Sequence, residues 1–302
     1  MIVIVGIDIN DATLTSSNVA EPFAGESVWA AATSYTLGQE VIRLTTHKKY
    51  KNILAGVDAG LPETTPTRWA ESGVTNKFAM FDKLRNTQTS VASPLNVTVT
   101  PNKRVNAIAV IGMVGDTITI SMTQLGVTIY SLTQNLSTRI VNNYYDYAYA
   151  EFGNMQAIAK FDLPPAANGV ISVSLTSATG SVKCGGVFIG SSTYLGALQY
   201  GARIGSLNFS TIERAFDGTA TLMPRKSKPT VTGKLFSPAS ITNKILAVKD
   251  AINGVPAVFS GLDDLGTDPR FDALLISGLL RNLEPTLDYP TTNIIDFELE
   301  EI

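Results

Sequence analysis

The chain has 302 residues, which is enough for two or three domains with their own cores. Apolar residues make up 44 % and charged residues 16 %, and this charged share is below the roughly 25 % usual for soluble proteins. Such a composition favours a β-rich protein whose faces are covered by neighbours. A net charge of −3 leaves no broad basic field of the kind that binds nucleic acid. The longest apolar runs are too short to span a bilayer, and the first residues lack the basic start of a signal peptide, so we expect synthesis in the cytoplasm.

Residues 1–24 open with the apolar run "MIVIVGI", which predicts a short strand followed by a polar stretch. An exposed apolar strand tends to pair with the edge of a sheet. We therefore expect residues 1–24 to be an extended arm that pairs with a sheet edge of this chain or of a neighbour.

Residues 25–72 are expected to form a small β module that depends on a few large aromatic side chains, because so short a segment buries little area. Both tryptophans of the chain, Trp29 and Trp69, lie at its ends, with Tyr35 and Tyr50 between them. All four are candidate glycan-binding residues. We expect Tyr50 and Trp69 to form a miniature core, whereas Trp29 and Tyr35 form the pair that could also stack on a sugar.

Residues 73–198 contain a train of short strands with turn signals about every ten residues, which predicts a β-sandwich. The stretch "TITISM" places Ile118, Ile120 and Met122 on one face of a strand. The single cysteine, Cys184, lies in the strand-like run "SVKCGGVFIG", so we expect a buried thiol and no internal disulfide.

A tyrosine-rich stretch, "NNYYDYAYAEF", interrupts this train of strands. We expect it to run as a strand or loop with alternating sides. Tyrosine is enriched at contact surfaces, so the stretch is a candidate interface; packing at a corner of the sandwich is the alternative. The candidate interface residues are Tyr144, Tyr145, Tyr147 and Tyr149.

Residues 199–302 are expected to form a β-sheet that packs one helix. The pair Asp217-Gly218 predicts a hairpin turn. Apolar residues that step by three and four predict a helix within 240–254, with Ser240 as its N-cap and Gly254 just past its end.

Two charged stretches in this part each allow two interpretations. The basic run "MPRKSKP" is a solvated turn or an inter-subunit ion pair, or it contacts an anionic partner; it holds Arg225, Lys226 and Lys228. The acidic run "GLDDLGTDPRFD" lacks the spacing of an EF-hand and is either an exposed turn or a weak calcium or magnesium site; it holds Asp263, Asp264, Asp268 and Asp272.

Catalytic patterns are sparse. The P-loop, GxSxG and HExxH patterns are absent, and one cysteine and one histidine disfavour a zinc site or a Cys–His dyad. The histidine, His47, stands beside Lys48 and Lys49, which favour its neutral form, and no serine is presented to it. A carboxylate pair for glycoside hydrolysis stays open, although no local arrangement indicates one. We therefore expect no enzyme, no cofactor and no metal.

The spacing "W-x5-Y-x2-G-x2-V" over Trp29, Tyr35, Gly38 and Val41 resembles small carbohydrate-binding modules of the chitin- and cellulose-binding type. In that family the early tryptophan and the tyrosine help to form the sugar platform, and Trp29 and Tyr35 match those positions. The chain departs from the family pattern where "HKKY" replaces the usual glycine before the central tyrosine.

The order of parts along the chain is similar to that of tailed-bacteriophage virion proteins: an arm, a carbohydrate-module-like segment, a sandwich, and a final third that resembles the sheet-plus-one-helix unit of tail-tube and distal-tail proteins. This resemblance implies a structural subunit of a tail, baseplate or collar in the virion. The implied partners are copies of itself, other tail proteins and host surface glycan, without nucleic acid. The alternative that it implies is a glycan-binding adhesin, which is a receptor-binding protein of the virion.

Overall fold

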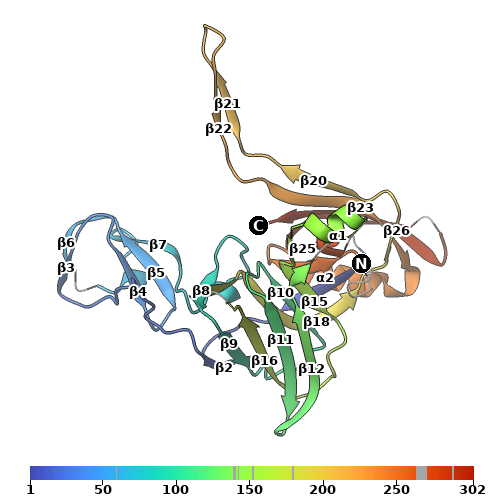
Figure 1. The fold of residues 1–302 in the computed structure, drawn as a ribbon, viewed down its shortest axis with the longest axis horizontal. Coiled ribbons are helices and arrows are strands. Elements are labelled where there is room, and N and C mark those ends of the chain that lie inside the picture. Colours follow the sequence, from blue (N-terminus) through green and yellow to red (C-terminus); the bar gives the residue numbers. More distant parts are fainter. Residues whose placement is uncertain are drawn as a thin grey trace.

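The computed structural model describes residues 1–58, 60–138, 141, 143–151, 153–178, 180–262, 271–287 and 289–302, without the side chains of residues 58, 271 and 272. The fold is mainly β, as the composition and periodicity predict. A body of two large antiparallel sheets carries two projections, a small module and a long hairpin (Figure 1).

The larger sheet of the body has ten strands and runs continuously through regions that the sequence assigned to separate units. Its order is β15-β10-β18-β1-β24-β25-β26-β23-β19, with β20 also paired to β23. The bounds are Ala157–Lys160 (β15), Ala107–Ile111 (β10), Gly186–Tyr194 (β18), Ile2–Gly6 (β1), Ala257–Ser260 (β24), Leu275–Thr286 (β25), Thr292–Glu301 (β26), Lys228–Pro238 (β23), Ala197–Leu198 (β19) and Arg203–Leu207 (β20).

The strand expected at "MIVIVGI" is present as β1 and pairs within this chain, but it lies in the interior of the sheet, so the expectation of an extended arm over residues 1–24 that pairs with a sheet edge is wrong. β1 pairs with β18 on one side and with β24 on the other. Val3 and Ile4 are both completely buried, and they point to opposite faces, toward different apolar clusters. A strand that is buried on both faces has apolar residues at consecutive positions, because successive side chains point to opposite faces. This is the physical reason for the apolar run "MIVIV".

A second sheet of five strands faces part of the first and completes a β-sandwich. Its order is β12-β11-β16-β9-β2, with bounds Val127–Asn135, Thr117–Gln124, Val170–Thr176, Leu95–Val99 and Leu14–Ser17. The predicted alternation is confirmed, because Ile118, Ile120 and Met122 are fully buried in the core between the sheets. β8 (Thr89–Ala92), β17 (Ser181–Cys184) and the 3-10 turn η2 (Ala79–Phe81) border this core.

In the C-terminal third, one helix packs on the sheet as predicted. The helix α2 spans Thr242–Ala251, follows the 3-10 turn η3 (Ala239–Ile241), and buries Ile245 against the second apolar core. The predicted cap Ser240 lies inside η3, and the N-cap residue is Ile241, which has no side-chain cap. Gly254 has a φ of +71° after the helix, a conformation that glycine adopts without strain. The short helix α3 covers Phe271–Leu274.

The small module is a separate unit between the β2 and β8 segments, at the left of Figure 1. A three-stranded sheet, β4 (Glu40–Arg43), β5 (Lys48–Asn52) and β7 (Trp69–Val74), packs beside the pair β3 (Thr33–Tyr35) and β6 (Gly56–Asp58). The 3-10 turn η1 (Pro62–Thr64) leads into β7. Its apolar cluster is separate from those of the body.

The second projection is a long hairpin that rises from the larger sheet at β20 and β23 (Figure 1). Its outer part pairs β21 (Thr211–Arg214) with β22 (Ala220–Met223), and the predicted Asp217-Gly218 turn joins them. We call residues 203–228 the projecting hairpin. Two short pieces lie elsewhere: the helix α1 (Tyr144–Tyr149) and the pair β13 (Ser137–Thr138) with β14 (Gly153–Asn154).

Candidate interaction surfaces

The aromatic residues of the small module form its core. Tyr35, Tyr50 and Trp69 are 3 %, 4 % and 2 % exposed. The rings of Tyr35 and Trp69 meet edge to face, with 5.0 Å between their centroids and 77° between their planes. The hydroxyl of Tyr35 donates to the carbonyl of Ala30 and accepts from its N–H. This burial bears out the miniature core over Tyr50 and Trp69, and it removes Tyr35 from an exposed sugar platform.

Trp29 is the remaining member of the predicted platform, and it is partly exposed at the edge of this core. The guanidinium of Arg43 lies over its ring, 5.0 Å from the centroid. Glu63 holds Arg43 in place, accepting hydrogen bonds from Nε at 3.2 Å and from Nη2 at 3.1 Å. One face of the Trp29 ring is therefore occupied by a cation from its own module.

An ionic cluster joins the small module to the body. His47 lies in the turn between β4 and β5, with a φ of +55°. Its Nδ1 is 3.0 Å from a carboxylate oxygen of Glu21, and its Nε2 is 2.9 Å from Oδ2 of Asp11. In sequence only Lys48 and Lys49 stand beside this ring, but in the fold carboxylates of two residues far away in sequence contact both of its nitrogens.

Further contacts extend this cluster. The Thr75 hydroxyl donates to Glu21 Oε1 at 2.6 Å, and the His47 ring stacks on Phe78 with 3.8 Å between centroids. A second carboxylate, Glu26, accepts from the Asn76 N–H at 2.9 Å and pairs with Lys49 Nζ at 3.0 Å. We call this set the ionic junction: Asp11, Glu21, Glu26, His47, Lys49, Thr75 and Asn76.

The tyrosine-rich stretch forms the short helix α1 rather than a strand or loop. Its tyrosines are exposed by 85 %, 69 %, 64 % and 72 % in chain order, so packing at a sandwich corner does not explain them. They pair along the helix, with ring centroids of Tyr145 and Tyr149 5.0 Å apart and those of Tyr144 and Tyr147 6.4 Å apart. The side chain of Asn143 caps the helix by accepting from the Asp146 N–H. Phe152 is outside the described residues.

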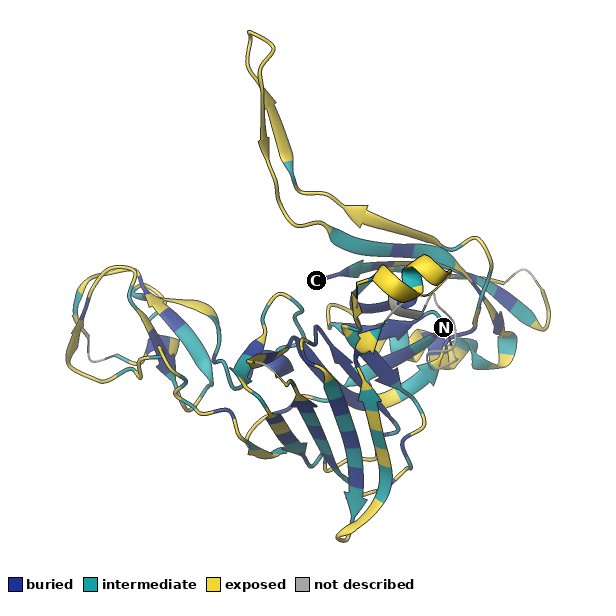
Figure 2. Ribbon diagram, viewed as in Figure 1, coloured by how far each residue is buried: buried dark blue, intermediate teal, exposed yellow. Residues whose placement is uncertain are grey.

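The projecting hairpin is exposed along almost its whole length (Figure 2). Between residues 203 and 227 every residue except Ser210 is classed as exposed. Phe216, near the tip, is 111 % exposed, and Ile212 and Leu222 are each 60 % exposed. The last two are register partners across the hairpin, so they form one apolar surface.

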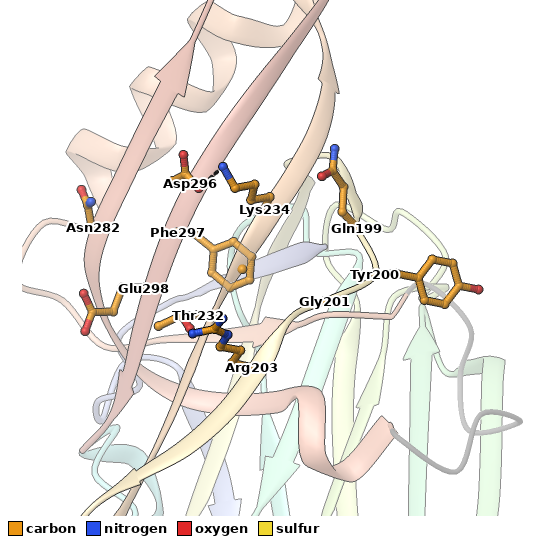
Figure 3. Close-up of a pocket in the computed structure, with 11 residues that line it drawn as sticks. Gln199, Tyr200, Gly201, Arg203, Thr232, Lys234, Asn282, Asp296, Phe297 and Glu298 are labelled. Atoms are coloured by element: carbon orange, nitrogen blue, oxygen red, sulfur yellow. Dashed lines mark ion pairs between the residues drawn. The ribbon is translucent and has the colours of Figure 1, made fainter.

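A groove of about 460 Å³ lies at the base of the hairpin, over β20, β23 and the outer face of β26 (Figure 3). Its wall carries the ion pair of Lys234 with Asp296, at 3.2 Å, and the exposed carboxylate of Glu298. Tyr200 borders the groove, but Figure 3 shows its ring directed away from the groove, and it is 97 % exposed. Two basic and two acidic side chains line the groove, so its charges balance: Arg203 and Lys234 against Asp296 and Glu298.

The remaining predicted residues have these positions. Cys184 is buried, as expected, and burial raises the pKa of its thiol to about 12. Arg225 and Lys226 lie between β22 and β23, and Lys228 is the first residue of β23; within the described part of the chain the three form no ion pair. The acidic run at Asp263, Asp264 and Asp268, and the side chain of Asp272, lie outside the described residues.

The described residues contain no group of three or more His, Cys, Asp or Glu side chains that could hold a metal ion. None of their helices has the length and apolar character needed to cross a membrane.

No known family model matches this chain, and no curated protein matches it. Sequence reasoning placed a turn at Asp217-Gly218 but missed the length and exposure of the projecting hairpin. The available signal was the alternation in "TIERAFDGTATLM", which predicts two strands but does not say whether their apolar face is covered. The ionic junction had no local signal, since its members are far apart in sequence.

Proposed function

We propose that the protein is a structural subunit of a phage tail or tail-associated assembly, and that it oligomerises through β-sheet contacts. The observation that carries this proposal is the projecting hairpin, with Phe216, Ile212 and Leu222 in solvent. A two-stranded hairpin is only marginally stable by itself in water, and exposed apolar patches mark interaction sites. An element of this kind fits an assembly in which a partner covers it.

The likeness in the order of parts adds support for the phage setting. Because β1 is integrated in the sheet, we assign the proposed assembly contact to the projecting hairpin instead of the N-terminal strand.

The test is to locate the protein in a virion. Purified particles of a tailed phage whose genome encodes this chain would be labelled with an antibody against residues 25–72 and imaged by electron microscopy. We expect label at a fixed position on the tail in every particle. Particles that lack the chain altogether, by labelling and by mass spectrometry, would remove the proposal.

Glycan binding is a second candidate, which the exposed tyrosines of α1 favour over the small module. Although the rings pair along the helix, most of their surface is in solvent and can stack on the apolar face of a sugar. Replacing Tyr145 and Tyr149 by Ala should abolish retention on host cell-surface polysaccharide, whereas Tyr200→Ala, at a still more exposed tyrosine outside α1, should not. Equal retention of both variants and wild type would exclude α1 as the sugar-binding site.

A further inference from the structure

The projecting hairpin has the dimensions of one side of a protein–protein interface. A standard interface uses roughly 20–30 residues per partner. The hairpin exposes nearly all of the 25 residues from 203 to 227. Apolar side chains recur along it and include aromatic and methionine residues, which are enriched at interface cores. They are Ile204, Leu207, Phe209, Ile212, Phe216, Leu222 and Met223.

The net charge of the hairpin is opposite in sign to that of the rest of the chain. Residues 203–228 hold five basic and two acidic side chains, which gives a net charge of +3. The whole chain has a net charge of −3, so the other residues sum to −6. Among the described residues, none of the five basic side chains pairs with a carboxylate, and all are exposed except Lys228, which is partly buried. The hairpin is therefore complementary in charge to the remainder of its own chain.

We infer that the projecting hairpin docks on the body of a second copy of this chain, in a head-to-tail contact. A contact of two hairpins with each other would bring +3 against +3, which disfavours a two-fold arrangement through this element. In a head-to-tail contact each copy donates its hairpin and receives that of a neighbour, which generates a ring when the rotation closes. This inference rests on the proposed assembly role and names the partner.

The size of the apolar surface favours a protein partner over an anionic polymer. Proteins bind phosphate backbones through basic side chains. A nucleic acid bound in this way would leave the large aliphatic side chains on both faces of the hairpin uncovered. Ile212 and Leu222 lie on one face of the hairpin, and their register neighbours Thr211 and Met223 lie on the other. Both faces thus carry an exposed apolar side chain.

The experiment measures self-association of the full chain by sedimentation velocity across protein and salt concentration. We expect the wild type to form a defined oligomer that weakens as salt rises. The triple replacement of Ile212, Phe216 and Leu222 by Ser should weaken association at least tenfold. Replacing Leu125 by Ser, which is 94 % exposed at the turn between β11 and β12, is the matched control and should have no effect.

Two further measurements keep the inference falsifiable if the triple variant fails to form its hairpin. Arg214, Arg225 and Lys226 replaced together by Gln should weaken association and reduce its salt dependence, because the charge is removed while much of the side-chain length is kept. A photo-crosslinker at position 216, in a mixture of ¹⁵N-labelled and unlabelled chains, should join the hairpin of one copy to the body of another.

These outcomes separate the inference from the proposed function. A wild type that stays monomeric at tens of micromolar, or crosslinks that join only hairpin to hairpin, would overturn docking on a second copy. Retention of the monomer on duplex DNA through the hairpin would overturn it in favour of an anionic partner. If the triple variant is also lost from virions while the wild type is monomeric in solution, the structural role stands and the partner is a different tail protein.

Discussion

The small module and the projecting hairpin both extend from the body, but they are stabilised in opposite ways. The cross-strand partners Val41 and Tyr50 in the module are 1 % and 4 % exposed, because Trp69 and Tyr35 pack over them. The cross-strand partners Ile212 and Leu222 in the hairpin remain in solvent. The same pairing of two apolar side chains therefore gives a folded unit in one place and an uncovered surface in the other.

The attachments to the body differ in the same way. The module is fixed by the ionic junction, in which Glu21 and Glu26 receive contacts from its turn and from the segment that follows β7. The hairpin continues the larger sheet through β20 and β23 and then leaves it. The module is stabilised by its own core and by its ionic attachment to the body. The outer part of the hairpin has no such contacts among the described residues and requires a partner to cover its apolar side chains.

The largest expected effect comes from the core of the module. Replacing Trp69 by Ala should cost about 3–5 kcal/mol, because a fully buried aromatic side chain is removed from a unit that has little else to bury. Hydrogen exchange should show loss of protection in β4, β5 and β7 and unchanged protection in β11. Trp29→Ala, at the edge of the core, is the control and should cost less. Unchanged protection in the Trp69 variant would mean that the body, not the aromatic core, holds the module together.

A smaller effect is expected at the ionic junction. The side chain of Glu21 is 5 % exposed, and it accepts from His47 and Thr75. Replacing it by Gln removes the buried carboxylate that contacts the His47 ring and the Thr75 hydroxyl, and we expect a loss of about 1–3 kcal/mol in the stability of the docked module. Limited proteolysis near residues 18–26 should become faster. Glu40→Gln, at an exposed site in β4, should leave the proteolysis rate unchanged, and equal rates for both variants would contradict the role of the junction.

Acid should loosen the same attachment. Burial of Glu26 raises its pKa, but the N–H groups of Phe23 and Asn76 and the ammonium of Lys49 together outweigh this, so its pKa lies below its ordinary value of 4.5. A carboxyl group whose pKa is depressed in the fold contributes stability above its ordinary pKa, and this contribution is lost as pH falls through the folded value. Denaturation of wild type and Glu26→Gln should therefore differ by a constant amount at neutral pH and converge in acid. A difference that persists unchanged at pH 3 would contradict this assignment.

Much of the fold could be predicted from local periodicity in the sequence. The alternation at Ile118, Ile120 and Met122, the helix that buries Ile245, and the turn at Asp217-Gly218 are short-range patterns, and the structure has each of them. The place of β1 was not predictable in this way, because pairing with β18 and β24 joins residues almost two hundred or more positions apart. The continuous apolar run is the signature of a strand with two buried faces, but by itself it does not distinguish an interior strand from an apolar arm that pairs with a sheet edge.

The candidate surfaces were harder to predict, for two physical reasons. Exposure of an aromatic ring depends on what packs over it, so Tyr35 at a platform position became a core residue through its hydrogen bonds with Ala30. The contacts of the His47 ring are likewise set by its neighbours in space, which are Asp11 and Glu21 rather than the two lysines beside it in sequence.

The smallest expected effect on the isolated subunit is at the tip of the hairpin. Phe216 is fully exposed, so Phe216→Ala removes no packing in the monomer and should change its unfolding free energy by less than about 0.5 kcal/mol. The measurement is denaturant unfolding at low protein concentration and high salt, where the subunit is monomeric. Trp69→Ala, measured in the same way, sets the scale for an aromatic residue that belongs to a core. A loss above about 1 kcal/mol for the Phe216 variant would show that the tip packs on its own chain, and the contrast between a self-contained module and an uncovered hairpin would no longer hold.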